Sequence, residues 1–195
     1  MNSSIITKKI IANAFKSFMK SQPFVKISVS DIMKACQMRR QTFYYHFQDK
    51  FELLEWIYQH ETKENISDFI NYERWENIFN QLFDYFYQNQ LFYKNALDVT
   101  EQNSFIDYLS QHTRTLYLKT INDILVHSNN TLDTDKKEII ASFYSHGFVG
   151  LIKEWIENSC SPEPEYMANT VKTSIHDQLT KAIQQSQVPI GGDQS

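Results

Sequence analysis

Apolar residues recur at spacings of three and four positions along almost the whole chain, which is the pattern of amphipathic α-helices. The chain has 195 residues but only 4 glycines and 4 prolines, and no stretch alternates apolar and polar positions as a half-buried strand does. The pattern therefore predicts an all-α fold. We expect helices over residues 5–21, 29–36, 40–47, 49–65, 73–88, 91–97, 104–126, 133–158 and 163–185.

The first expected helix has an apolar face and a basic face. The apolar face, which we expect to be buried, consists of Ile6, Ile10, Ala14 and Phe18, with Ile11 and Phe15 beside them. The outer face is expected to carry Lys8, Lys9, Lys16 and Lys20. Pro23 then ends the helical pattern.

Two short helices joined by a tight turn come next. Ser28 is expected to cap the first of them, because Asp31 follows three residues later and completes an approximate capping box. Phe43 and Phe47 lie four positions apart in the second helix and are expected to point together into the core. The first helix is expected to bury Ile32, Met33 and Cys36. This arrangement is typical of a helix-turn-helix.

The side chains left outside this core are suited to contact DNA. Arginine and glutamine form paired hydrogen bonds with guanine and adenine, so Arg40 and Gln41 are candidate base readers. Tyr44 and Tyr45 are candidates for contact with thymine methyl groups or phosphate. The candidate contacts are Ser28, Ser30, Arg39, Arg40, Gln41, Thr42, Tyr44, Tyr45 and His46. Two alternatives stay open: Ser28 acts only as a helix cap, and the Tyr44 ring only packs the module.

The distribution of charge supports a basic N-terminal surface. Residues 1–50 hold nine Lys or Arg against two acidic residues, a net charge of +7, whereas the remaining residues carry a net charge of −11. A basic end of this kind is suited to a polyanion, although an ordinary basic surface is the alternative. Cys36 and Cys160 lack metal-ligand spacing, so we expect no metal and no cofactor. No apolar run of about 18 residues occurs, and we expect a soluble cytoplasmic protein without membrane contact.

The segment TFYYHF at residues 42–47, followed by Lys50, Leu53 and Leu54, resembles the TetR family of transcriptional regulators. The segments WIYQHE at 56–61, LFYKNAL at 91–97 and EQNSF at 101–105 look like the subgroup that regulates dihydroxyacetone kinase operons. The resemblance implies an N-terminal three-helix DNA-binding domain over residues 1–50 and a helical ligand and dimerisation domain over 51–186. It also implies that Lys50 contacts phosphate. Residues 187–195 are expected to form a flexible tail.

Two positions depart from the family pattern. Gln37 stands where the family usually has a glycine, so the backbone must either accept a positive φ or form the turn differently. Arg39 stands where a small capping residue is common, which adds charge but weakens the N-cap of the second helix.

A single module of this size makes few contacts, so we expect a homodimer on a near-palindromic double-stranded operator. Apolar stripes in the last two expected helices are suited to the subunit contact. The candidate interface residues are Phe143, Gly147, Gly150, Leu151, Trp155, Ile175 and Leu179. The two glycines each cost about 1 kcal/mol in a helix, which favours a close approach of helices there. Packing within one chain is the alternative.

Aromatic residues are concentrated in the central segment. The TetR resemblance implies an effector pocket in this region, with Trp75, Phe79, Phe83, Phe86 and Tyr93 as candidate lining residues. An aromatic stripe at helical spacing is more often simply core. The resemblance to regulators of dihydroxyacetone kinase operons implies a different input, a co-activator protein similar to a kinase subunit.

Other classes of function are less well supported. The six histidines form no HExxH or comparable metal pattern, and no nucleophile motif or glycine-rich phosphate loop is present, so an enzyme is not expected. An interaction adaptor that has lost DNA binding is a second rival. The basic and polar surface from Arg39 to His46 favours a DNA-binding regulator over both.

Overall fold

The structure is a computed structural model that describes residues 3–62, 75–99, 105–128 and 131–185, without the side chains of residues 62, 75, 76, 176, 178, 179 and 182–185. Within these ranges every element is helical, which confirms the all-α prediction. The elements are α1 (Ser3–Met19), η1 (Phe24–Lys26), α2 (Val29–Ala35), α3 (Arg40–His46), α4 (Lys50–Thr62), α6 (Trp75–Gln88), α7 (Gln90–Leu97), α8 (Phe105–Ser128), α9 (Thr134–Glu157) and α10 (Pro164–Gln185).

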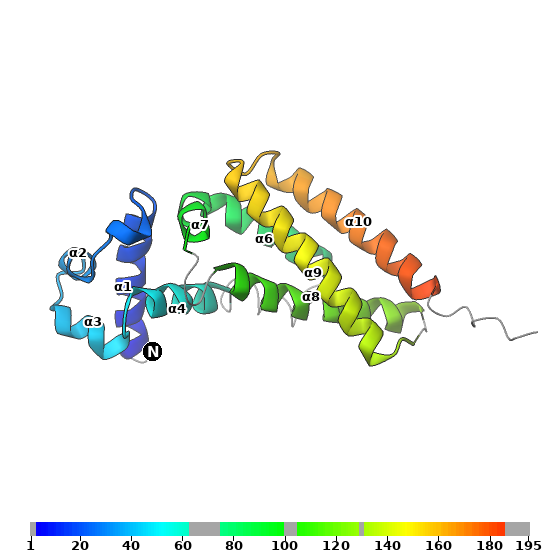
Figure 1. Ribbon diagram of the computed structural model, residues 1–195, viewed down its shortest axis with the longest axis horizontal. Helices are drawn as coiled ribbons and strands as arrows, with labels where there is room; N and C mark the ends of the chain where they lie inside the picture. The colour runs from blue at the N-terminus through cyan, green and yellow to red at the C-terminus, as the bar shows by residue number, and fades with distance from the viewer. Residues whose placement is uncertain (1–2, 63–74, 100–104, 129–130, 186–195) are drawn as a thin grey trace, which may run out of the picture.

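The molecule is elongated, with α1, η1, α2 and α3 gathered at one end (Figure 1). Helix α4 leads away from this module, and α7 lies close to the module on the same side as α6. Helices α6, α8, α9 and α10 extend to the opposite end, where α8 packs chiefly against α9 and α10 packs chiefly against α6. One continuous apolar core runs from α1 to α10. The module at one end is therefore joined to the helical body by packing as well as by the chain.

The expected helices agree with the observed ones to within two residues at each end that the structure describes. The short η1 was not expected, because three residues are too few to show a helical period. The ends expected at residues 65 and 73, and the tail expected at 187–195, lie outside the described residues.

The buried face of α1 differs from the expected one. Ile6 and Ile10 are exposed, whereas Ile11, Phe15 and Met19 are fully buried, with the neighbouring Ala12. Two adjacent stripes of α1 both repeat every four residues, and the period alone cannot choose between them. The packing of α1 on α2, α3, α4 and α7 selects the stripe of Phe15. Lys16, expected on the outer face, is instead partly buried and paired with Glu61 on α4.

The turn between α2 and α3 is built on Gln37, which has a φ of 54°. The amide N–H of Gln37 donates to the carbonyl of Lys34 (3.1 Å), and that of Met38 donates to Met33 (2.9 Å). These two bonds form a Schellman motif, which satisfies the last carbonyls of α2. The backbone therefore keeps the glycine-type turn and accepts the positive φ.

The apolar stripe expected along α9 is divided between two directions. Phe148 and Trp155 point inward and stack edge-to-face on Phe83 of α6, with ring centroids 5.9 and 5.2 Å apart. Ile139 and Phe143 point outward and are 68% and 74% exposed. Trp155 is thus a core residue and not an interface residue as expected, since α9 has an apolar surface on both sides.

Replacing Gln37 by glycine is expected to stabilise the protein by about 0.5 to 1 kcal/mol. A left-handed conformation costs an L-residue about 1 to 2 kcal/mol, and glycine removes this cost. The larger backbone entropy that glycine loses on folding cancels part of this stabilisation. The side chain of Gln37 is exposed, so its removal loses no packing. Thermal unfolding followed by circular dichroism measures the change as a rise of about 1 to 4 °C in Tm.

Gln37→Val is the matched control, because a β-branched side chain tolerates a positive φ even less well than glutamine. It is expected to lower Tm. A Gln37→Gly protein that melts below the wild type would show that the turn is not strained at this position.

Candidate nucleic-acid interface

Helix α2 begins at a complete capping box. The Ser28 hydroxyl accepts from the Asp31 amide N–H (3.1 Å) and donates to the Asp31 carboxylate (2.5 Å), while the Ser28 amide N–H donates to that carboxylate (3.3 Å). These bonds from Ser28 hold the pKa of Asp31 below its usual value of 3.8. The capping role expected of Ser28 is confirmed. Its neighbour Ser30 is exposed in the first turn.

Helix α3 is anchored by two phenylalanines. Phe43 and Phe47 are buried, with ring centroids 5.6 Å apart. Arg39 occupies the N-cap of α3 and makes no side-chain capping hydrogen bond. This agrees with the weak N-cap expected for an arginine, whose side chain has no acceptor. Because one side of α3 is used for packing, its remaining side chains lie on the surface. Arg39, Arg40, Gln41, Tyr44 and Tyr45 are exposed, and Thr42 and His46 are half-buried.

Arg40 and Tyr44 form a pair one turn apart on the exposed face of α3. The Arg40 guanidinium donates a hydrogen bond of 2.9 Å to the Tyr44 hydroxyl and lies 5.5 Å from the centre of its ring. Tyr44 is 50% exposed, so its ring packs only partly against Phe43. Tyr44 thus holds the guanidinium on the outer surface of the helix, at the end of the helix that enters a DNA groove in helix-turn-helix proteins.

His46 marks the edge of this surface. Partial burial, together with the nearby Lys8 ammonium, lowers the pKa of His46 below its usual 6.5. The imidazole is therefore neutral at pH 7 and is a hydrogen-bonding group there, not a cation. The Lys8 ammonium itself lies 4.9 Å from the centre of the Phe47 ring, at the C-terminal end of α3.

Lys50 is turned into the module. Its ammonium donates to the carbonyl oxygens of Phe24 (2.7 Å) and Ile27 (2.9 Å) and lies 4.3 Å from the centre of the Phe24 ring. Phe24 and Ile27 are buried. The ammonium is therefore engaged within the module, and the expected contact with phosphate, which stays a prediction, would require it to leave these carbonyls. Lys50 holds the entry to α2 in place.

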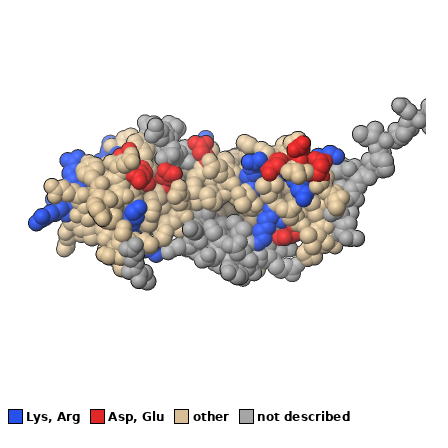
Figure 2. Space-filling view, turned by 90° about the horizontal axis from the view of Figure 1, so that it is seen from below, with Lys and Arg blue, Asp and Glu red and all other residues tan. Residues whose placement is uncertain are grey.

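Figure 2 shows Lys and Arg side chains at the tip of the module, on the face that it presents, and mixed charges over the helical body. Arg39 at the N-cap of α3 and Arg40 in its first turn are both exposed. The basic surface expected from the sequence therefore lies next to the exposed face of α3.

The aromatic residues expected to line an effector pocket separate into two groups. Phe79 and Phe83 are fully buried against Phe148 of α9 and are core residues. Phe86 and Tyr93 border an enclosed cavity of about 30 Å³. Further residues around this cavity, which the sequence did not indicate, include Tyr58, Tyr85, Tyr108 and His112. The side chain of Trp75 lies outside the described residues.

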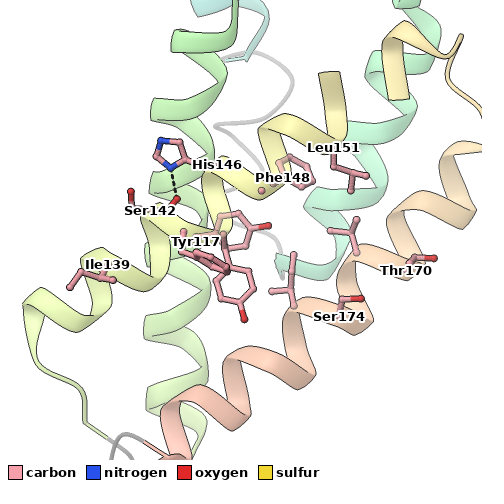
Figure 3. Close-up of a pocket in the computed structure, with 13 residues that line it drawn as sticks. Tyr117, Ile139, Ser142, His146, Phe148, Leu151, Thr170 and Ser174 are labelled. Atoms are coloured by element: carbon pink, nitrogen blue, oxygen red, sulfur yellow. Dashed lines mark hydrogen bonds between the residues drawn. The ribbon is translucent and has the colours of Figure 1, made fainter. Parts of the chain in front are cut away.

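A larger and more open groove lies between α9 and α10. Its volume is about 670 Å³, and Figure 3 shows its lining residues, which come from α8 (Tyr117), from α9 (Ile139, Ser142, His146, Phe148 and Leu151) and from α10 (Thr170 and Ser174). Of the expected interface residues, Phe143, Gly147, Leu151 and Ile175 border this groove. Ile175 is only 3% exposed, so it belongs mainly to the packing of α10 within the chain. The side chain of Leu179 lies outside the described residues.

The two glycines of α9 lie on its exposed side. A Cβ atom added at Gly147 or Gly150 would meet no other atom within 4 Å. Packing against the described residues of the same chain therefore does not account for these glycines. Both lie on the same side of α9 as the exposed Phe143.

Among the residues that the structure describes, no group of three His, Cys, Asp or Glu side chains is arranged to hold a metal ion. No helix in the described part of the chain is long and apolar enough to span a membrane.

Comparison with known proteins gives two family matches. Residues 10–57 match the family described as "Bacterial regulatory proteins, tetR family", and residues 73–177 match "Transcriptional regulator C-terminal region". A curated relative, the "HTH-type dhaKLM operon transcriptional activator DhaS" of Lactococcus lactis subsp. lactis (strain IL1403), is 49% identical over 94 residues. That match spans 48% of this chain and half of the length of the relative.

Two solved structures are similar over most of the chain. The "Dihydroxyacetone kinase operon activator DhaS" superposes with a TM-score of 0.79 and 32% identity, covering 91% of this chain and 98% of that one. The TetR family repressor AlkX from Dietzia sp. strain DQ12-45-1b, implicated in biodegradation of n-alkanes, has a TM-score of 0.53 and 18% identity over the same shares. The second likeness concerns the fold alone.

Replacing Lys50 by methionine is expected to lower the free energy of unfolding by about 2 kcal/mol or more. A charged hydrogen bond contributes about 1.5 to 3 kcal/mol. The Ile27 carbonyl would lose the Lys50 donor, and the Phe24 carbonyl would keep only the amide N–H of Ile27. Urea denaturation measures the change. Lys26→Met, an exposed lysine in η1, is the matched control and is expected to stay within about 0.5 kcal/mol of the wild type. Equal stability of Lys50→Met and the wild type would show that the bonds of Lys50 to these carbonyls do not stabilise the module, and would favour the phosphate contact instead.

Proposed function

The chain belongs to the TetR family of bacterial transcriptional regulators, and from this premise we propose that it binds a near-palindromic DNA operator as a homodimer and controls a dihydroxyacetone kinase operon. The observation that carries the proposal is the exposed face of α3, where basic, amide and aromatic side chains lie together on a helix anchored by Phe43 and Phe47. We place the boundary between the DNA-binding and regulatory domains near residue 50.

We assign roles on α3 by chemistry. Arg40 and Gln41 read base edges, since their side chains match guanine and adenine with paired hydrogen bonds. Tyr45, which is 83% exposed, contacts a thymine methyl group or a phosphate. The sugar-phosphate backbone of the DNA is contacted by Arg39, by Ser30 and by the half-buried Thr42 and His46. The Arg40 guanidinium has five N–H donors, so one can stay on the Tyr44 hydroxyl while two others bond to a base. Lys50 acts by holding the module in shape.

The subunit contact in our proposal is the outer side of α9 together with the groove between α9 and α10. Phe143 and Ile139 are apolar and exposed there. Burial of such an apolar patch against a second subunit is favourable, so the patch is suited to an interface. The bare backbone at Gly147 and Gly150 allows a second helix to approach closely. Helix α3 lies at the opposite end of the molecule from α10 (Figure 1), so a contact on this face leaves α3 exposed in both copies, as binding to two half-sites requires.

The target and the signal in our proposal follow the relatives. Both DhaS proteins are named as activators, one of the dhaKLM operon and one of a dihydroxyacetone kinase operon. We propose that this chain likewise acts on such an operon and receives its signal from a co-activator protein similar to a dihydroxyacetone kinase subunit. Direct sensing of a small hydrophobic ligand is the rival. The enclosed aromatic cavity of about 30 Å³ has room for roughly one water molecule, which favours the protein signal.

Genome-wide binding of the tagged protein is expected to give a single main class of near-palindromic sites beside a dihydroxyacetone kinase operon. Arg40→Ala is expected to weaken binding to those sites by about 1 to 3 kcal/mol and to relax base preference at one position of each half-site, because a base-reading arginine contributes to discrimination. Mobility-shift titrations on the recovered site, with single-base variants, measure both effects.

Arg39→Ala is the matched control, as an exposed arginine next to Arg40 without a base-reading role in our assignment. It is expected to weaken all sequences equally and to reduce the slope of log affinity against log salt by about one. Dihydroxyacetone is expected to change occupancy in cells but not the affinity of the purified protein. Equal losses on every sequence for both variants would contradict the assigned roles, and a ligand effect on the purified protein would favour direct sensing.

Replacing Phe143 by arginine is expected to convert the dimer to a monomer. A buried charge without a partner on a two-fold contact costs several kcal/mol in each copy, so the dimer dissociation constant is expected to rise at least about 100-fold. Sedimentation velocity at micromolar concentration measures the state. Val126→Arg, at an equally exposed apolar position at the end of α8, is expected to stay dimeric. A dimeric Phe143→Arg protein would move the contact to another face.

A further inference from the structure

A chain of polar contacts crosses the joint between the DNA-binding module and the helical body. Lys16 of α1 forms an ion pair with Glu61 of α4, and its ammonium also donates to the Asn89 carboxamide (3.3 Å) just before α7. The second carboxylate oxygen of Glu61 accepts from the hydroxyl of Tyr85 on α6. That hydroxyl lies 2.8 Å from the hydroxyl of Tyr93 on α7. Four helices therefore meet through five side chains.

The Lys16–Glu61 pair is largely removed from water. The two side chains are only 14% and 19% exposed, and the Lys16 ammonium lies 5.2 Å from the centre of the Phe92 ring. A charge in such a place depends strongly on its partner, because loss of one member leaves the other poorly solvated. The ion pair therefore favours one relative position of α1 and α4 over positions in which the two helices are slightly shifted.

Tyr85 is a dependable donor to Glu61. Burial raises the pKa of Tyr85 far above its usual value of 10, and the nearby Glu61 carboxylate raises it further. The hydroxyl therefore keeps its proton at any physiological pH. Tyr85 and Tyr93 also form part of the wall of the small cavity beneath α4. A change in packing between α6 and α7 would therefore reach Glu61 through a hydrogen bond of fixed direction.

A second bridge lies one turn further along α1. The Asn95 carboxamide of α7 donates to the carbonyls of Met19 (3.0 Å) and Gln22 (2.5 Å) and accepts from the amide N–H of Phe24 (3.1 Å). These bonds hold the C-terminal end of α1 against α7. A swing of the module about this end of α1 would have to break the bonds that Glu61 makes to Lys16 and Tyr85.

Small angles at this joint produce large displacements at α3, which lies toward the other end of α1 (Figure 1). Helix α1 has 17 residues and is about 25 Å long. A swing of about 10° moves its far end by about 4 Å, which is more than the 3.4 Å rise of one base pair. Two modules on a palindrome move in opposite directions, so the effect on their separation doubles.

We propose that Glu61, held by Lys16 and Tyr85, is the positioning residue that sets the angle of the DNA-binding module and so determines which spacing between operator half-sites the dimer accepts. This inference rests on the proposed function as a dimeric DNA-binding regulator. Glu61 touches no DNA in this role. Its effect is on the spacing of half-sites and not on the bases within them.

The test measures binding to a series of operators in which the recovered half-site is kept and the spacer is lengthened or shortened by one and two base pairs. The full-length wild type is expected to prefer one spacer over its neighbours by about tenfold or more. Glu61→Gln, which keeps the shape but removes the charge, is expected to reduce that preference to about threefold or less, with base preference within the half-site unchanged. Lys16→Met is expected to do the same, and the double variant to do no more than either.

The matched control is Glu55→Gln, a carboxylate of the same helix that bonds to Gln59 on α4 itself (2.9 Å), and it is expected to keep the wild-type spacer profile. Tyr85→Phe removes one oxygen atom and gives a second, milder variant should Glu61→Gln melt below the assay temperature. Its expected spacer preference lies between those of the wild type and Glu61→Gln.

The outcomes separate the two proposals. A wild type without affinity for any palindromic site overturns the proposed function and this inference together. This inference alone is overturned if the wild type binds and the three variants keep its spacer profile, whatever their affinity. The three variants are Glu61→Gln, Lys16→Met and Tyr85→Phe. An equal broadening by Glu55→Gln also overturns it, because the effect would then follow from any loss of charge on α4.

Discussion

The packing of α1 is the interaction on which the rest of the structure depends. Its buried side contacts α2 and α3 within the module, and the same helix contacts α4 and α7 of the helical body. Ile11, Phe15 and Met19 lie four residues apart and are almost completely buried. Hydrophobic contacts have no preferred direction. In our proposal the polar groups beside them therefore set the angle between the DNA-binding module and the helical body. Lys16 and the carbonyl of Met19 bind partners outside the module, so one helix both completes the core of the DNA-binding module and attaches that module to the body.

The same division of labour leaves α3 free to contact DNA. Phe43 and Phe47 take the packing role on one side of the helix, and Lys50 supplies the buried carbonyls near η1 with a donor. The helix needs no further anchor, so its polar side chains remain on the surface. Arg40 is already ordered there by the Tyr44 hydroxyl. A rigid helix that displays its polar side chains loses little conformational entropy on binding, which is why such a surface suits specific recognition.

Much of the fold was predictable because its signals are local. Helix periods and the Ser28–Asp31 capping box each depend on residues within one or two turns of each other, and both agree with the structure. The sequence left two forms of the turn at Gln37 open, and the structure has the one with a positive φ. The choice between neighbouring apolar stripes was not predictable, because it depends on partners distant in the chain. Ile6 and Ile10 were expected to be buried and are exposed, and Trp155 was expected at a subunit contact and lies in the core.

Sequence by itself determined the all-α class, the positions of the helices, the helix-turn-helix and the basic and polar surface of α3, since each follows from spacing and composition along a short segment. Only the tertiary structure decided where Lys50 points, how the central aromatics divide between core and cavity, and that Lys16 meets Glu61 across 45 residues. Hydrogen bonds and ion pairs act over a few ångströms, so the partner of a polar side chain is known only when the helices that carry both have been brought together.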